Sequence, residues 1–247
     1  MCLLSGCSKR AESHDLSNGA RSTAISQALS ASEKLFSARQ DISKLREAVK
    51  ILGEARNPDQ RNYEIEWKFA KYSYFLGKVE PLEKDAIEVF EKGKDAGRIA
   101  SRVNPNAPDG HFWFGANLGE LSRISPITVG IKSVDDIRES MNKVIELDPS
   151  YQGASAYDAL GQLEMATRTL KGGKTEKAVE FYERGIELAP DNANIRLHLA
   201  EAYLFLKRDA DAKRQLNALF TMTPNPDYVT EHQAAVVKGR SLLEKNF

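Results

Sequence analysis

The sequence has almost no cysteine and no long apolar run. Its two cysteines, Cys2 and Cys7, both lie in the first seven residues, so the rest of the chain offers no thiol for a disulfide or a thiolate-bound metal. No apolar stretch approaches the roughly 20 residues that cross a bilayer. Lysine plus arginine and aspartate plus glutamate each total 35, and this balance gives no reason to expect nucleic acid or an anionic membrane surface as a partner.

Patterns that mark sheets, metal sites and catalysis are also missing. No period-two run of β-branched residues is long enough for a sheet. None of the four histidines lies three or four residues from another, so we expect no metal site and no cofactor. The segment 171–175 ends like a phosphate-binding loop, but Arg168 stands where the first glycine is required, and we interpret it as a hairpin turn. With no nucleophile, base and metal set, we expect no enzyme activity.

The first residues resemble a processing signal. Leu4, Ser5, Gly6 and Cys7 resemble the lipobox of exported bacterial lipoproteins, in which small residues precede a cysteine whose thiolate accepts a lipid. This predicts lipidation at Cys7, a periplasmic location, and a membrane contact only through the lipid. The leader is short, which a start chosen too late would explain; a chance tetrapeptide in a cytoplasmic protein is the alternative. We expect residues 1–22 to be a signal remnant and flexible tether, or else a frayed terminus.

An interval of 34 residues recurs in the C-terminal half of the chain. The pairs at this interval are Ala166 with Ala200, Ala178 with Ala212, Tyr182 with Leu216 and Pro190 with Pro224. This interval is the tetratricopeptide period. Alanine lets two antiparallel helices approach closely, and proline ends a helix. The pattern therefore predicts two helical hairpins, at 159–192 and 193–226.

Helix pairs of the same kind extend upstream with irregular spacing. We expect first helices around Trp67 and Trp113, second helices around Phe90 and Met141, and an opening pair at 29–36 and 45–52. Residues 230–245 read as a capping helix, with these residues facing inward: Ala234, Val237, Leu242 and Leu243. The prediction is an all-α fold over residues 23–247, with about four and a half tetratricopeptide-like hairpins stacked as a right-handed solenoid.

The first helices of such a stack line its concave surface, and here their outward faces are apolar. Helical spacing assigns the groove to Tyr72, Phe75, Phe114, Leu118, Leu121, Leu163, Leu170, Leu197, Leu204 and Phe205. Grooves that bind peptide tails usually present Lys, Arg and Asn, and only Lys171 and Asn194 offer these. We therefore predict a hydrophobic ligand or a partner helix in the groove. The alternative is that superhelical curvature or the cap buries these side chains.

Several features together resemble the T component of TRAP transporters, a family of periplasmic tetratricopeptide lipoproteins. They are the lipobox, the irregular early repeats, the segment Gly-His-Phe-Trp-Phe-Gly-Ala-Asn-Leu-Gly at 110–119, and Tyr151-Gln152-Gly153 at the start of the next helix. The resemblance covers about 25–245, and much of it is shared with the microtubule-dynamics regulator family.

Membership of the T-component family would imply a homo-trimer with an apolar channel. Such an assembly docks a solute-binding protein that delivers organic acids or hydrophobic ligands. The alternative function is a generic assembly lipoprotein that holds a cell-envelope or secretion partner.

Overall fold

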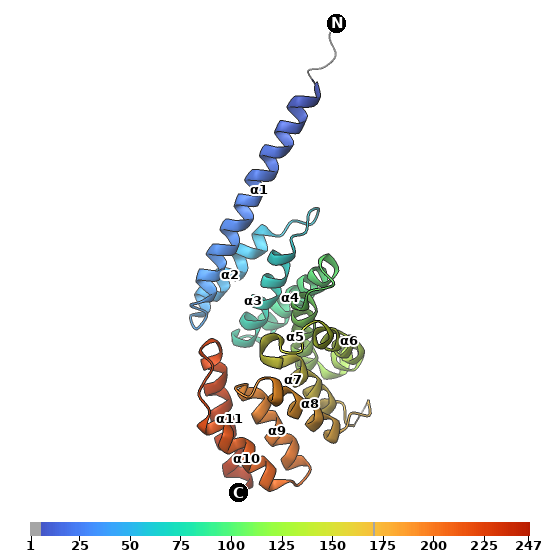
Figure 1. Cartoon of the computed structure of the whole chain (residues 1–247), viewed down its shortest axis with the longest axis vertical. Helices are drawn as coiled ribbons and strands as arrows, with labels where there is room; N and C mark the ends of the chain where they lie inside the picture. The colour runs from blue at the N-terminus through green and yellow to red at the C-terminus, as the bar shows by residue number, and fades with distance from the viewer. Residues whose placement is uncertain (1–5, 170) are drawn as a thin grey trace.

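The computed structural model describes residues 6–169 and 171–247, with side chains from residue 19 onward. Over these residues the chain is helical and contains no strand, which confirms the predicted all-α class (Figure 1). The helices are α1 (Gly6–Phe36), α2 (Ile42–Ala55), α3 (Tyr63–Val79), α4 (Glu83–Val103), α5 (Pro108–Ile124), α6 (Ile131–Leu147), α7 (Tyr151–Ala166), α8 (Thr175–Leu188), α9 (Ala193–Phe205), α10 (Asp209–Thr221) and α11 (Val229–Asn246).

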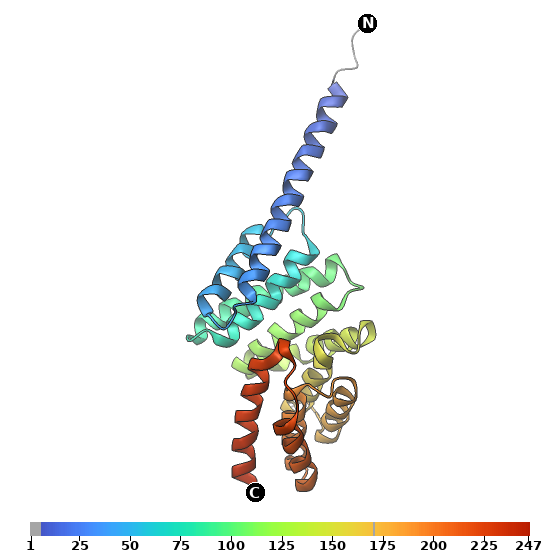
Figure 2. The same cartoon turned by 60° about the vertical axis from the view of Figure 1, so that its left-hand side comes forward.

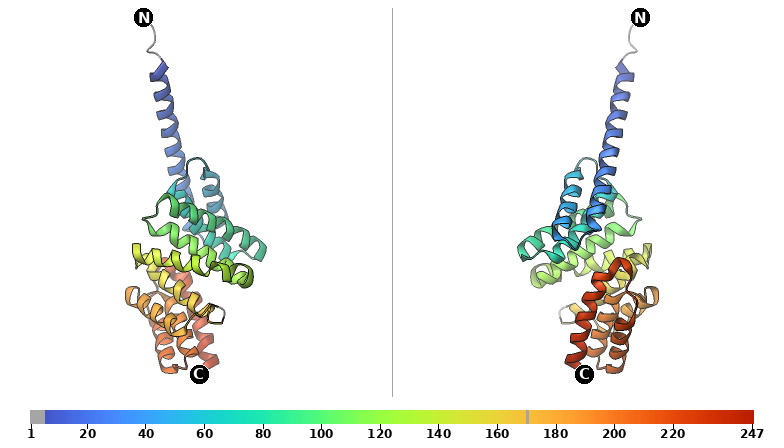
Figure 3. Two further views of the ribbon diagram at one scale, coloured as in Figure 1. Left: turned by 90° about the vertical axis from the view of Figure 1, so that its right-hand side faces the viewer. Right: turned by 90° about the vertical axis from the view of Figure 1, so that its left-hand side faces the viewer.

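The helices stack as consecutive antiparallel pairs, and α11 closes the C-terminal end (Figures 2 and 3). Each helix from α1 to α11 packs against the next one in the chain. In addition, α3 contacts α5, α5 contacts α7, α7 contacts α9, and α9 contacts α11. The odd-numbered helices therefore form one continuous wall, which is the arrangement of a tetratricopeptide-like solenoid.

Helix α1 runs through residues 8–22, where the sequence suggested a flexible tether. The first proline of the chain is Pro58, and the segment contains several good helix formers, so no residue there forces the helix to stop. Figure 1 shows the N-terminal part of α1 extending away from the stacked helices. The domain boundary at residue 22 stays a prediction.

Small residues occupy three of the four predicted helix crossings. Ala178, Ala200 and Ala212 are fully buried, whereas Ala166 is exposed. The crossing of α7 and α8 instead uses Gly161, where an added Cβ would lie 2.3 Å from the Tyr182 ring. Gly161 lies within α7, whereas Ala166 is its last residue, so α7 crosses α8 inside the helix rather than at its C-terminal end.

The capping helix is present, but its buried face differs from the predicted one. Ala235 is buried, and Gly239 approaches the preceding helix so closely that a Cβ would lie 3.0 Å from Leu219. Val237 is 68% exposed. Ala234 is exposed too, while Leu242 and Leu243 are half-buried. Since successive residues of an α-helix point about 100° apart, choosing Ala234 in place of Ala235 turns the wrong face toward the core.

The connection from α5 to α6 is a tight turn rather than an extended loop. Residues Pro126–Gly130 form a single π-helical turn, η1, in which the amides of Val129 and Gly130 both donate to the Ser125 carbonyl, at 2.9 Å and 3.1 Å. π-Helical turns are rare and frequently lie at functional sites. Here the turn places the start of α6 against the concave wall.

Candidate functional site: the concave cavity

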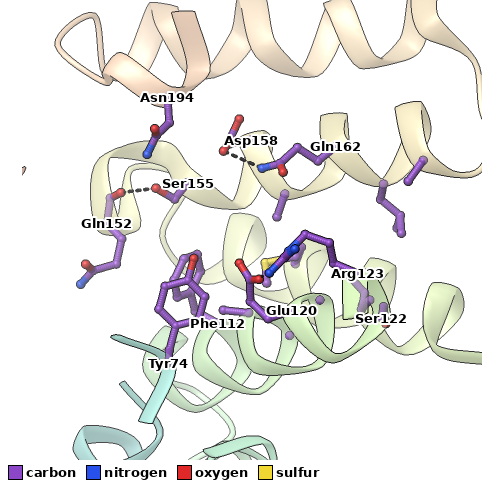
Figure 4. Close-up of a pocket in the computed structure, with 18 of the residues that line it drawn as sticks. Tyr74, Phe112, Glu120, Ser122, Arg123, Gln152, Ser155, Asp158, Gln162 and Asn194 are labelled. Carbon is purple, nitrogen blue, oxygen red and sulfur yellow. Dashed lines mark hydrogen bonds and ion pairs between the residues drawn. The ribbon is translucent and has the colours of Figure 1, made fainter. Parts of the chain in front are cut away.

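A cavity of about 590 Å³ lies on the concave side, between α5 and α7 (Figure 4). Its walls come from α3, α5, α6, α7, the start of α9 and the start of α11. The apolar part of the lining includes Phe112, Trp113, Val134, Ile137, Met141 and Leu163. Its volume falls in the range of about 300–1,000 Å³ that is typical of ligand pockets.

Glycine on α5 keeps this space open. Gly115 and Gly119 lie one turn apart and both line the cavity. A Cβ built on Gly119 meets no atom within 4 Å, so the space beside this residue is empty. A Cβ on Gly115 would meet the end of the flexible Met141 side chain at 2.5 Å. The absence of a side chain at Gly119 therefore leaves open space on this face of α5, whereas Gly115 makes room for Met141 of α6.

One polar edge of the cavity is an ion-pair cluster around Glu120. Its carboxylate accepts from Lys78 Nζ and from Arg123 Nε, both at 2.8 Å, and its side chain is only 11% exposed. Burial alone would raise the pKa of Glu120, but the charge and hydrogen bond of Lys78, with Arg123, outweigh it and lower the pKa. Glu120 is therefore ionised and already satisfied, and it fixes Arg123 at the rim (Figure 4).

The opposite wall carries a second carboxylate, Asp158 of α7. Its oxygens pair with His198 Nδ1 at 2.7 Å and accept from Gln162 Nε2 at 2.9 Å. Burial works to lower the pKa of His198, but the charge and hydrogen bond of Asp158 outweigh it and raise the pKa above its usual 6.5. The protonated imidazole is thus stabilised by folding.

The His198–Asp158 pair makes stability depend on pH in a defined direction. Because the folded-state pKa is raised, the contribution of His198 is complete below about pH 6.5 and is lost as the pH rises through the folded-state pKa. We expect His198→Gln to lower the free energy of unfolding more at pH 5.5 than at pH 8.5. Urea titrations of the natural and variant chains at both pH values measure this difference, and an equal or inverted difference would contradict the assigned pair.

The first turn of α7 has a left-handed backbone beside the cavity. Gln152, Gly153 and Ala154 have φ angles of 50°, 64° and 58°, a conformation that costs about 1–2 kcal/mol for each residue other than glycine. Neighbouring side chains hold it: Asn192 Nδ2 donates to the Gly153 carbonyl at 2.7 Å, and the Tyr228 hydroxyl donates to Gln152 Oε1 at 2.9 Å. Strain of this kind concentrates at functional sites.

A segment near the C-terminus closes one side of the cavity. It comprises residues 222–228 and includes the short helix η2 (Pro226–Tyr228), and its residues Asn225 and Tyr228 line the cavity. Arg39 Nη2, in the α1–α2 turn, donates to the Asp227 carbonyl at 3.0 Å across 188 positions of sequence. Figures 1 and 2 show the start of α11 beside the lower part of the first hairpin. We call residues 222–228 the strap.

The structure brings only part of the sequence-assigned groove together. Phe75 and Leu163 line the cavity, as do Lys171 and Asn194. Four others lie in the cores between helices, with exposures of 2–5%: Tyr72, Leu118, Leu121 and Leu197. They do so because spacing counted from the crossing residues selects a face turned toward the neighbouring helix. Leu170 and the side chain of Cys7 lie outside the described residues.

The remaining three predicted groove residues lie away from the cavity. Phe114 packs under Arg98, whose Cζ is 4.6 Å from its ring centroid, and Leu204 is half-buried against the C-terminal core. Phe205 is 56% exposed, with Arg168 Cζ at 4.1 Å from its ring. Sequence reasoning missed the roles of α6, the strap and α11, although the Gly115–Gly119 spacing was a usable signal.

Two absences in the described residues bear on metal binding and on membrane spanning. In the described part of the chain, no group of three or more His, Cys, Asp or Glu side chains is placed to hold a metal ion. The helices described there include none that is long and apolar enough to span a membrane. Absence of enzyme activity, lipidation at Cys7 and a periplasmic location all stay predictions.

The fold is that of a tetratricopeptide-like repeat scaffold. Proteins of this class bind other proteins on an extended concave surface. Two solved structures have the same fold. One is the thermophilic tetratricopeptide protein TTC0263 of Thermus thermophilus, with a TM-score of 0.59 and 16% identity, covering 86% of this chain and 98% of that one. The other is MamA of Desulfovibrio magneticus, with a TM-score of 0.51 and 18% identity, covering 78% of this chain and 92% of that one.

The chain belongs to the family described as Regulator of microtubule dynamics protein 1-3, which matches residues 28–245. A curated relative is Regulator of microtubule dynamics protein 3 of Rattus norvegicus, which is 23% identical over 192 residues. That match covers 72% of this chain and 40% of the rat protein, so the chain spans about two fifths of this relative's length.

This family assignment corrects the resemblance to TRAP T components. That resemblance was wrong, because the family model that matches residues 28–245 is that of the microtubule-dynamics regulators. The repeat period and the alanine and proline positions belong to tetratricopeptide proteins in general. They therefore identified the fold without separating the two families.

Proposed function

We propose that this protein is a non-catalytic interaction scaffold that holds an apolar segment of a partner protein in its concave cavity. The observation that carries this proposal is the cavity of about 590 Å³, with an apolar floor and a polar rim. Filling an apolar space with apolar groups is favourable, by about 25 cal/mol for each Å² of apolar surface that is removed from water.

The rim has the groups that a peptide backbone needs. Gln152, Gln162 and Asn194 all border the cavity, and each amide side chain can donate and accept hydrogen bonds. Figure 4 shows these side chains on α7 and α9 around the space above α5. A partner segment with apolar side chains on one face would place them on the floor and bond its backbone at the rim.

Site-specific crosslinking tests this proposal. We expect a photoreactive benzoylphenylalanine at Gln162, on the rim, to capture the partner, whereas the same residue at Glu180, exposed on the outer helix α8, captures none. Capture at Gln162 should be lost when Gly119→Leu fills the cavity. Equal capture at the two positions, or capture that survives the filled cavity, would reject the concave site.

The family name suggests which partners to test first. Because the rat relative is named as a regulator of microtubule dynamics, tubulin and microtubule-associated proteins are the first candidates for the crosslinking experiment. Co-sedimentation of the chain with assembled microtubules, compared with its Gly119→Leu variant, measures whether such an association depends on the cavity.

A further inference from the structure

Lys71 of α3 carries a half-buried ammonium group with no carboxylate partner. One turn earlier, Lys68 pairs with Glu33 and with Glu64, the latter at 2.8 Å. Among the described residues, Nζ of Lys71 makes no ion pair or hydrogen bond. It lies instead 5.3 Å from the ring centroid of Phe36 and 5.8 Å from that of Trp113.

A second cation, Arg39, stands against the same aromatic surface. Its Cζ is 5.0 Å from the Phe36 centroid and 5.5 Å from the Phe75 centroid. Tyr72 stacks on Phe36 with ring centroids 4.1 Å apart and planes at 8°. Arg39 and Lys71 therefore lie against the same ring, and the positive charge of Arg39 acts on Lys71.

Asp109 and Asp227 act on Lys71 through their negative charge, but neither makes an ion pair or hydrogen bond with it in the described part of the chain. Asp109 is held by the hydroxyls of Tyr63 and Tyr151, both at 2.7 Å. The strap residue Asp227 accepts from Arg39 through its backbone carbonyl, and this uses one of the guanidinium's five N–H donors. Burial, and next the positive charge of Arg39, lower the pKa of Lys71. An anion between the two groups would relieve this repulsion.

The cation pair adjoins the cavity. Arg39 Cζ lies 5.5 Å from the ring centroid of Phe75, and Lys71 Nζ lies 5.8 Å from that of Trp113. Both rings are part of the cavity lining. Tyr228 of the strap lines the same end. Arg39 and Lys71 are not among the lining residues themselves, but each lies against an aromatic ring that is, so a molecule on the apolar floor comes within one ring of both cations.

We propose that Arg39 and Lys71 bind an anionic group, a carboxylate or a phosphate, of the molecule whose apolar part occupies the cavity. The inference rests on the proposed function and narrows it, since the bound segment must then combine apolar side chains with a negative charge at one end. For a protein partner this group is an aspartate or glutamate side chain or a terminal carboxylate. Arg39 suits it, because a guanidinium matches a carboxylate with two parallel hydrogen bonds.

Two fluorescent probes separate the anion site from the apolar cavity. Anilinonaphthalene sulfonate is apolar and anionic, whereas Nile red is apolar and neutral. We expect Lys71→Gln to raise the dissociation constant of the sulfonate about tenfold, as loss of a charge-assisted hydrogen bond does, and to leave that of Nile red within twofold. Lys71→Arg should restore sulfonate binding. Lys34→Gln, an exposed lysine of α1, is the matched control and should change neither.

The outcomes distinguish this site from the proposed function. Equal sulfonate affinity in the natural and Lys71→Gln chains, or an equal loss of both dyes, overturns the anion site while Nile red binding still supports the cavity. A natural chain that binds neither dye overturns both proposals. Circular dichroism of each variant at the titration temperature shows that the helices are intact, so a loss of sulfonate binding is not a loss of fold.

A competition experiment identifies the source of the anion. Acetylated leucine-rich peptides with a free terminal carboxylate, their amidated counterparts and inorganic phosphate are each added to the sulfonate complex. Displacement by the carboxylate peptide, but not by its amide or by phosphate, assigns the site to a partner segment. Displacement by phosphate alone assigns it to free phosphate groups, and displacement by none of the three overturns the site.

Discussion

Replacing Gly119 by leucine is expected to abolish binding in the cavity while leaving the fold intact. A Cβ at this position meets nothing within 4 Å, and the residue lines the cavity, so a leucine side chain grows into the space that a ligand would fill. Leucine is also a better helix former than glycine by up to about 1 kcal/mol. We expect the dissociation constant of Nile red to rise at least about tenfold, with an unchanged or higher melting temperature.

Gly119→Ala is the graded control for this experiment. One methyl group gives the same gain in helix propensity but removes little volume from the cavity. Binding should therefore stay within about twofold of the natural chain, while stability rises as it does with leucine. If Gly119→Leu left dye binding and partner crosslinking unchanged, the concave cavity would not be the binding site.

Gly97→Leu is expected to destabilise the fold, in contrast to Gly119→Leu, which should abolish binding and leave the fold intact. Gly97 lies on α4, where a Cβ would come within 2.5 Å of the backbone nitrogen of Phe114 and 2.7 Å of its Cα. Backbone atoms cannot rotate away as a side chain can, so α4 and α5 must separate. Overpacking costs about 1–3 kcal/mol and sometimes more; for this contact we expect a loss of about 3 kcal/mol or more in the free energy of unfolding.

Urea unfolding followed by helical circular dichroism compares Gly97→Leu directly with Gly119→Leu. The two variants carry the same chemical change in neighbouring helices, so differences in propensity nearly cancel. Because α4 and α5 join the second hairpin to the third, their separation should also split the transition into two steps, as expected when repeats contact only their neighbours. Equal midpoints for the two variants would show that the contact of α4 with α5 adapts to a side chain.

The sequence predicted most of the fold because the relevant signals are local or periodic. Proline at the ends of α8 and α10, alanine at 178, 200 and 212, and apolar residues at helical spacing each act within one hairpin. The register of α7 was less accessible, because Gly161 rather than Ala166 meets Tyr182. Helix propensity and apolar spacing do not predict which of these two small residues packs against the Tyr182 ring.

The site was harder to predict than the fold because it depends on contacts between distant residues. The cavity needs α5, α6 and α7 at a particular spacing, and it is bordered by a strap that begins more than 90 residues after α5 ends. Apolar residues on α5 follow the same helical spacing whether they pack only between helices, as Leu118 and Leu121 do, or also border the cavity, as Phe112 and Ala116 do. Periodicity identifies an apolar face without naming what it contacts.

The hydrogen bond from Arg39 to Asp227 ties the first hairpin to the strap that borders the cavity. In an open array of repeats, the terminal units fray independently and folding can start at any point. Here the contact joins two segments 188 positions apart, and bringing such distant segments together has an entropic cost that grows with their separation. A chain shortened at either end can therefore keep its remaining helices and still lack a complete cavity edge, so the binding surface belongs to the whole array rather than to any one hairpin.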